Sequence, residues 1–229
     1  FVQLIFLLCF IHLTVNAQQK KNYSKETQNK ITSVENNLRP WIKIKGEPDW
    51  TLDERMKYYH VNGISIVVIK DFKIDWAKGY GLADSLSGKP VSTATLFQAG
   101  SISKSINGLG VLSLVQNGKL DLDKDINEYL QSWKFPYDSL SKGKKISLAN
   151  LLSHTAGLSG HGFPGYERGD TIPSIIEILN GTPPANTKPI RSQFEPSLKY
   201  KYSGGGTTIS QLIVQDVTQQ PYDEFMRKT

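Results

Sequence analysis

Apolar residues recur every three or four positions in the middle of the chain and predict a helix over residues 100–117. The positions on its main apolar face are Ile102, Ile106, Leu109, Leu112 and Val115. Val111 and Leu114 extend the apolar surface around the other side, and Asn117-Gly118 is a typical helix end. We therefore expect one helix that is buried on almost every side.

Two stretches before this helix have the period of β-strands. Residues 63–70 are β-branched and apolar, residues 73–81 alternate, and Asp71-Phe72 lies between them, which predicts a β-hairpin. The first strand is apolar on both faces, so we expect it to be central or covered in its sheet. Further helices are expected at residues 51–60, 146–152 and 171–179 and from Ile209 onward.

The N-terminal residues 1–17 have the pattern of a secretory signal peptide. Their apolar run, residues 4–11, is too short to span a bilayer, and Ala17 is a small residue suited to signal peptidase. A retained anchor helix is the alternative, and the lack of an initiator Met and a basic start indicates a clipped sequence. We interpret the polar, Lys-rich residues 18–46 as a mobile tether that runs into a short helix, followed by one domain over residues 47–229. Export to the periplasm or the cell exterior is expected.

Composition excludes several classes of function. A chain of 229 residues with 38% hydrophobic content can bury a sizeable core in one domain or two closely packed lobes. Cys9 is the only cysteine, and the four histidines lack the spacing of zinc ligands, so we expect no disulfide, metal or cofactor. The net charge of +6 is spread along the chain, without the basic and aromatic interleaving of a nucleic-acid surface. We expect no nucleic-acid partner and no membrane span in the mature chain, and the oligomeric state stays open.

A buried helix should not begin with Ser and Lys residues unless their chemistry is needed. Ser101 and Lys104 are three positions apart, so they share a helix face and the amine can reach the hydroxyl. A Ser hydroxyl becomes a nucleophile when a neighbouring base takes its proton, and the positive potential at a buried helix start favours a neutral amine as that base. The alternative is that Ser101 is a helix N-cap and Lys104 a surface residue.

The same Ser-x-x-Lys spacing occurs at Ser139/Lys142 and at Ser141/Lys144. These residues lie in a polar stretch that contains Gly143 and has no apolar periodicity, which predicts a solvated loop. Only the pair at Ser101 is therefore a candidate for catalysis.

A second informative stretch runs from Tyr202 through the consecutive glycines 204–206 into the helix that contains Ile209. Glycine lets the backbone turn tightly and approach another group closely. On its own this stretch is better explained by a glycine-rich turn with a packed Tyr than by a functional contact.

Five segments occur in an order and at spacings typical of one family. They are residues 63–69, residues 95–97 with 101–104, residues 117–123, residues 151–158 and residues 202–204. Together they resemble the serine β-lactamase and penicillin-binding-protein superfamily, in the branch of class C β-lactamases, D-alanyl-D-alanine carboxypeptidases, D-aminopeptidases and β-lactamase-like esterases. The resemblance implies an α/β fold of the α+β type, β-lactamase/transpeptidase-like, with an antiparallel sheet flanked by helices beside a mainly helical lobe.

By that resemblance Ser101 is the acylated nucleophile, Lys104 its proton acceptor and Tyr202 the base of the second motif. Gly204 stands at the substrate-binding position where the family usually has Asn, which lowers the expectation of β-lactam hydrolysis and favours esterase or peptidase action. His154 belongs to a family signature, and we expect it to cap nearby backbone rather than to act in catalysis.

The third motif of the family, a Lys-Thr-Gly or His-x-Gly strand, is not found, so we expect a protein truncated at its C-terminus that lacks part of the sheet. The main hypothesis is an exported serine hydrolase that forms a Ser acyl-enzyme with an ester, a D-amino-acid peptide or a β-lactam. The alternative is a non-catalytic, penicillin-sensor-like binding module. An intact set of Ser101, Lys104 and Tyr202 favours the enzyme, because a binding module has no need for all three.

Overall fold

The computed structural model describes residues 22–39, 41–47 and 49–229. The segment interpreted as a signal peptide, residues 1–17, lies outside the described residues. The described residues form two compact units, one that ends at Gln98 and one over Ala99–Thr229.

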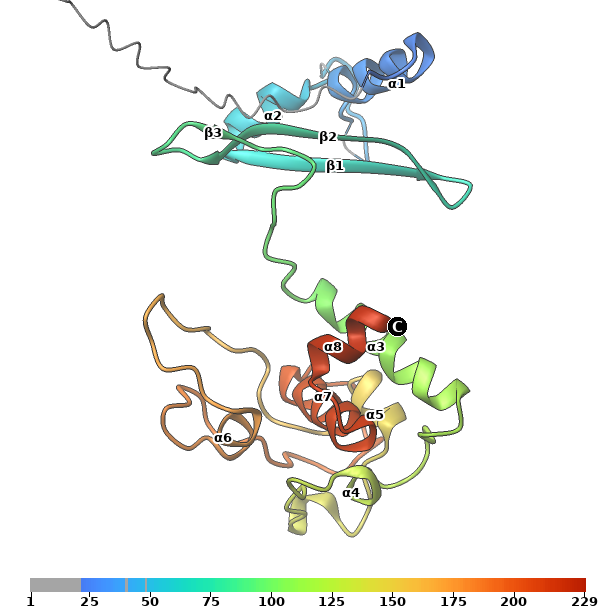
Figure 1. Ribbon diagram of the computed structural model, residues 1–229, viewed down its shortest axis with the longest axis vertical. Coiled ribbons are helices and arrows are strands. Elements are labelled where there is room, and N and C mark those ends of the chain that lie inside the picture. The colour runs from blue at the N-terminus through green and yellow to red at the C-terminus, as the bar shows by residue number, and fades with distance from the viewer. Residues whose placement is uncertain (1–21, 40, 48) are drawn as a thin grey trace, which may run out of the picture. The chain divides into compact units, whose positions relative to one another are not determined.

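The first unit contains a small antiparallel sheet and the helices α1 and α2 (Figure 1). The strands are β1 (Gly63–Lys70), β2 (Lys73–Asp84) and β3 (Lys89–Pro90), and the helices are α1 (Lys25–Asn36) and α2 (Leu52–Tyr58). The register pairs Gly63 with Gly81 and Lys70 with Lys73, so the expected hairpin is confirmed. The expected helix at α2 begins with a capping box formed by Thr51 and Glu54.

Strand β1 lies at an edge of the described sheet, whose order is β1-β2-β3. Val67 and Ile69 are 53% and 66% exposed. The expectation of a central or covered strand is wrong for the described sheet, because β1 pairs with β2 alone and the face that carries Val67 and Ile69 is exposed. An edge strand with exposed β-branched residues is prone to pair with other strands.

Helix α1 lies within the 18–46 segment that was expected to be a tether running into a short helix. The Tyr23 hydroxyl donates to the Ala77 carbonyl at 2.8 Å and accepts the Ala77 N–H at 2.9 Å. Lys78 forms an ion pair with Glu35 at 2.5 Å. These contacts join α1 and the residue before its cap to β2, so this part of the segment is packed against the sheet.

The second unit is helical and is built around α7 (Gly204–Thr218). Figure 1 shows α7 beside α3 (Ile102–Gln116), α5 (Leu148–Leu152) and α8 (Tyr222–Lys228). The other helical elements are α4 (Ile126–Tyr129), the 3-10 turn η1 (Ser139–Ser141) and α6 (Ile175–Asn180). Capping boxes at Ser147 and Ser174 start α5 and α6 later than their predicted ranges. The core beneath these helices includes Ile126, Leu130, Leu148, Leu158, Ile209 and Ile213.

Helix α3 has the predicted position, but it is buried on one face only. Val111 and Leu114 are buried, and Gly110 faces Met226 and Phe225 of α8 so closely that an added Cβ would lie 2.4 Å from the Met226 sulfur. Leu109, on the other face, is 62% exposed. The expectation of a helix buried almost throughout is wrong within this unit, because α7 and α8 cover only one side of α3.

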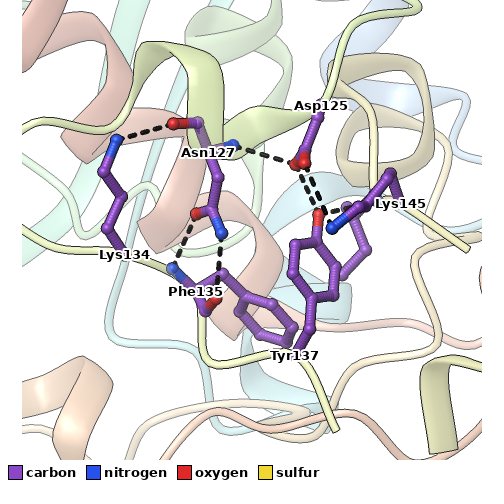
Figure 2. A network of polar contacts seen from close by, with 7 residues as sticks. Asp125, Asn127, Lys134, Phe135, Tyr137 and Lys145 are labelled. Atoms are coloured by element: carbon purple, nitrogen blue, oxygen red, sulfur yellow. Dashed lines mark hydrogen bonds and ion pairs between the residues drawn. The ribbon is translucent and has the colours of Figure 1, made fainter. Parts of the chain in front are cut away.

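A polar network fixes the chain between α4 and α5 (Figure 2). The Tyr137 hydroxyl donates to the Asp125 carboxylate at 2.5 Å and accepts the Ile146 N–H at 2.9 Å. The Asn127 side chain accepts the Phe135 N–H at 2.8 Å and donates to the Phe135 carbonyl at 3.0 Å. These hydrogen bonds satisfy backbone groups that have no partner within a helix or strand. They therefore hold the long connection between α4 and α5 in one conformation.

Candidate active site

Ser101 lies at the N-terminus of α3, in the N-cap position, but it does not act as a cap. Its backbone has helical angles (φ −72°, ψ −8°), and its side chain makes no capping hydrogen bond within the described chain. The Ser101 Oγ lies instead 2.8 Å from the Tyr202 hydroxyl and accepts a hydrogen bond from Lys104 Nζ at 3.2 Å. The interpretation of Ser101 as a helix cap beside a surface Lys is therefore wrong.

Tyr202 precedes α7 and meets Ser101 across 101 positions of sequence. The expected approach of its hydroxyl to Ser101 is present, and Lys104 Nζ lies 5.0 Å from the centre of its ring. The contact with Lys104, and after it the hydrogen bond with Ser101, lower the pKa of the Tyr202 hydroxyl from its ordinary value. These contacts therefore make the Tyr202 hydroxyl easier to deprotonate than a free Tyr, beside the Ser101 hydroxyl.

The start of α7 holds Tyr202 in this place. Ser203 caps the helix, since its Oγ accepts the Gly206 N–H at 3.0 Å and donates to the Ser159 carbonyl at 2.6 Å. The N–H groups of Gly204 and Gly205 donate to the carbonyls of residues 161 and 160 at 3.1 and 3.0 Å. The backbone at the start of α7 therefore docks directly on residues 159–161, a close approach that the consecutive glycines permit.

Two imidazole rings pack against the Tyr202 ring. The ring centre of His154 lies 4.4 Å from that of Tyr202, and the ring centre of His161 lies 4.9 Å from it. His154 Nδ1 accepts the Ser203 N–H at 3.3 Å, which is the backbone-capping role expected for this residue. His161 was missed by the sequence reasoning, because it lies in a Gly- and Pro-rich stretch without periodicity.

Residues 49–229 match the family model described as Beta-lactamase. The chain belongs to the β-lactamase family.

Curated relatives and solved structures agree with this assignment. The protein flp of Staphylococcus aureus (strain MRSA252) is 26% identical over 181 residues, which are 78% of this chain and 34% of flp. A β-lactamase of Pseudomonas fluorescens is 28% identical over 186 residues, which are 81% of this chain and 48% of that enzyme. The octameric penicillin-binding protein homologue from Pyrococcus abyssi superposes with a TM-score of 0.63 at 25% identity, over 77% of this chain and 40% of that one.

The described helices and antiparallel sheet belong to the β-lactamase/transpeptidase fold, as the resemblance implied. The chain spans about a third of flp and about half of the Pseudomonas enzyme.

Within the second unit, a cavity of about 720 Å³ opens beside Ser101. Its lining consists of Gly100, Ser101, Ser103, Lys104, Asn107, His161, Gly162, Phe163, Tyr200, Tyr202, Gly204, Thr207, Thr208, Gln211 and Tyr222. Lys104 is the one charged side chain in this lining of described residues, and four of the lining residues are Phe or Tyr. The cavity is thus an aromatic pocket with a single cation beside the candidate nucleophile.

Asn107 and Tyr222 form a polar floor that sequence reasoning also missed. Asn107 is only 3% exposed; its Oδ1 accepts from the Tyr222 hydroxyl at 2.9 Å and its Nδ2 donates to Ser210 Oγ at 2.8 Å. The sequence did contain a signal for this floor: Asn107 is a polar amide one turn beyond Lys104, on a helix that was predicted to be buried. Each buried polar group here has a partner, so the floor is rigid.

Gly204 lines the cavity at the position where the β-lactamase family usually has Asn. A Cβ added to Gly204 would lie 3.1 Å from the His161 carbonyl oxygen and 3.3 Å from the Phe163 ring. A side chain would fit here only if its neighbours moved by a few tenths of an ångström. The loop that carries His161 and Phe163 therefore occupies space beside Gly204 that a larger residue would need.

The other Ser-x-x-Lys pairs have a different environment. Lys142 and Lys144 form ion pairs with Glu195 at 3.9 and 3.2 Å. Ser141 is buried and lies 3.0 Å from Ser192 Oγ, so the prediction of a solvated loop is wrong for this residue. The Ser141 hydroxyl therefore hydrogen-bonds with another Ser hydroxyl and not with a Lys amine.

Residues 22–39, 41–47 and 49–229 contain no group of three or more His, Cys, Asp or Glu side chains that could hold a metal ion. Among the helices of the same residues, none combines the length and the apolar character that a membrane span requires.

Proposed function

We propose that the protein is an exported serine hydrolase that forms an acyl-enzyme on Ser101. The observation that carries this proposal is the position of Ser101 Oγ, 2.8 Å from the Tyr202 hydroxyl and 3.2 Å from Lys104 Nζ. A nucleophile within hydrogen-bonding reach of a base, which a third group orients, is the arrangement that activates a Ser hydroxyl. Membership of the β-lactamase family supports the same chemistry.

In the proposed mechanism the immediate proton acceptor is Tyr202 and not Lys104, the acceptor that the family resemblance implied, because Lys104 Nζ donates a hydrogen bond to Ser101 Oγ. The Ser101 hydroxyl transfers its proton to the Tyr202 oxygen while Oγ attacks the carbonyl carbon of the substrate. Lys104 assists because its hydrogen bond to the Tyr202 hydroxyl, and to a smaller extent its positive charge, lower the pKa of that hydroxyl and so stabilise the phenolate that takes the proton.

The negative charge that develops on the carbonyl oxygen needs a donor. The Ser101 backbone N–H makes no hydrogen bond within the described part of the chain, and it lies at the positive end of α3. When the tetrahedral intermediate collapses, the leaving group takes the proton from Tyr202 and the acyl group stays on Ser101. Water then gives a proton to the Tyr202 oxygen and attacks the acyl carbon, the bond from that carbon to Ser101 Oγ breaks, the carboxylic acid leaves, and the proton passes from Tyr202 to Oγ.

The proposed substrates are small carbonyl compounds or peptides: an ester, a D-amino-acid peptide or a β-lactam. Gly204 borders the substrate with backbone only, so no side-chain amide from this position holds a substrate amide. This favours esters and peptides over β-lactams. Export rests on the signal-peptide pattern of residues 1–17, which precede the proposed hydrolase domain over residues 47–229.

A fluorophosphonate probe tests the nucleophile in the full-length protein. Peptide mass mapping after labelling near neutral pH should find the adduct on Ser101, and Ser101→Ala should abolish it. Ser139→Ala is the matched control and should label like wild type, because Ser139 belongs to an exposed Ser-x-x-Lys pair. If the Ser101→Ala variant is labelled as fast as wild type, the assignment of Ser101 as the nucleophile is wrong. The non-catalytic binding module then becomes the better hypothesis.

A further inference from the structure

His154 binds the chain on both sides of Tyr202. Its backbone carbonyl accepts the Lys201 N–H at 2.8 Å, and its Nδ1 accepts the Ser203 N–H at 3.3 Å. Its ring packs on the Tyr202 ring at 4.4 Å between centres and meets the Tyr200 ring edge-on at 6.0 Å. One residue therefore fixes the backbone before and after Tyr202 and the face of its ring.

The hydrogen bond to Ser203 sets the protonation state of the imidazole. Nδ1 can accept an N–H only when it carries no proton, so His154 is neutral with its proton on Nε2. If Nδ1 carried a proton, its N–H would face the Ser203 N–H, and two hydrogen-bond donors would repel each other. Ser203 also caps α7, so a shift of its backbone would move the start of the helix together with Tyr202.

The groups around His154 oppose its protonation. Burial, and after it the positive charge of Lys104 on α3, lower the pKa of the His154 imidazole. The other titratable groups nearby are Tyr200 and Tyr202 on the segment before α7, and His161 against the Tyr202 ring. No carboxylate lies within ion-pairing distance of His154 in the described residues, so nothing there stabilises an imidazolium.

We propose that His154 is a positioning residue that holds Tyr202 against Ser101 only while its imidazole is neutral. The consequence for acylation rests on the proposed function, but the requirement for neutrality does not. Protonation of His154 releases the Ser203 N–H, the Tyr202 hydroxyl moves away from Ser101 Oγ, and the site loses its proton acceptor. The site therefore shuts off at acidic pH through a residue that touches no substrate.

Two variants of the full-length protein distinguish the hydrogen-bond acceptor of His154 from the packing of its ring. His154→Asn offers an oxygen in place of Nδ1, cannot take up a proton and tolerates the positive φ of 57° at this position. His154→Phe keeps a ring but removes the acceptor. We expect fluorophosphonate labelling of Ser101 to fall on the order of tenfold to hundredfold in the Phe variant, as misplaced catalytic groups do. The labelling rate of the Asn variant should stay within severalfold of the wild-type rate at neutral pH. The fall of that rate at acidic pH should become smaller, because the contribution from protonation of His154 is lost.

His60→Asn is the matched control, since His60 also has a positive φ (53°) but is exposed and belongs to the first unit. It should leave the pH profile unchanged. If His154→Asn keeps the wild-type acidic limb, or if His154→Phe labels as fast as wild type, the proposal is wrong.

Imidazole ¹⁵N NMR tests the neutral state without any activity. The spectrum should show the Nε2–H tautomer for His154 and a pKa below the ordinary value of about 6.5. A His154 with its proton on Nδ1, or a pKa at or above the ordinary value, would overturn the proposal even if Ser101 labels well. A protein that never labels but shows this tautomer and a lowered pKa would contradict the proposed hydrolase and support the positioning contact.

Discussion

At the residue scale, the proposed role of Lys104 is to ease the ionisation of Tyr202. It lowers the pKa of the Tyr202 hydroxyl, so Lys104→Ala should let that pKa rise towards its ordinary value of about 10. The phenolate then forms only at higher pH, and the rising limb of Ser101 labelling should move to higher pH. Rates of probe labelling measured across a pH series check this shift.

The matching variants define the role of each group. Tyr202→Phe should slow labelling on the order of a hundredfold to ten-thousandfold at every pH, because a positioned base typically contributes that much. Lys142→Ala is the control, since Lys142 pairs with Glu195 at 3.9 Å and should change nothing. An unshifted profile in Lys104→Ala would mean that Lys104 does not act through Tyr202.

At the scale of the element, the glycines that open α7 are not equivalent. A Cβ on Gly205 would lie 2.6 Å from the side chain of Ile190, which is fully buried, whereas a Cβ on Gly206 would find only ordinary contacts from 3.6 Å outward. Gly205→Ala should therefore destabilise the protein by about 1–3 kcal/mol through overpacking. Gly206→Ala should be neutral or stabilise it by about 0.5–1 kcal/mol, because Ala favours a helix over Gly. Denaturant melts of the two variants test the difference, and equal effects would contradict the docking of α7 at Ile190.

The network between α4 and α5 offers a second test at this scale. Tyr137→Phe removes the donor to Asp125 and leaves the Ile146 N–H without its acceptor, which should cost about 1–3 kcal/mol of unfolding free energy. Burial and the Asp125 carboxylate raise the pKa of the Tyr137 hydroxyl, so it stays protonated and the cost should not vary with pH near neutrality. Thermal melts at several pH values measure it. Tyr58→Phe, at a residue that is 63% exposed, is the control and should melt like wild type.

At the scale of the whole molecule, the largest apolar core belongs to one unit. Its members run from Val111 to Phe225, all within Ala99–Thr229. We therefore expect a polypeptide of residues 99–229 to melt cooperatively, as a unit with its own core does. A gradual melt with strong dye binding would contradict this.

The same polypeptide should self-associate through the exposed face of α3. That face includes Ile102, Ile106 and Leu109, which are 70%, 52% and 62% exposed. Leu109→Glu should reduce association in sedimentation experiments without lowering the melting temperature, because the residue is not part of the core. Ile106→Leu keeps the face apolar and should associate like the parent polypeptide.

Local chemistry by itself determined much of this protein. The i, i+3 spacing of Ser101 and Lys104 puts them on one helix face wherever the helix lies, and strand periodicity with a two-residue turn places the hairpin. Such features depend on neighbours within a few positions, which the sequence states directly. The partner of Ser101 is different: the residues themselves left Tyr202 as an ordinary packed side chain, and only the family resemblance joined it to Ser101.

Tertiary packing decided the rest. The docking of α7 on residues 159–161 brings Tyr202 to Ser101, and it brings His154 and His161 to the Tyr202 ring. Packing also left one face of α3 exposed and put β1 at an edge, against the apolar pattern of both. An apolar periodicity states which faces can be buried, but which of them are covered depends on segments far away in sequence. Contacts between segments that are distant in sequence form when the whole core packs together. A local pattern of residues therefore does not specify them.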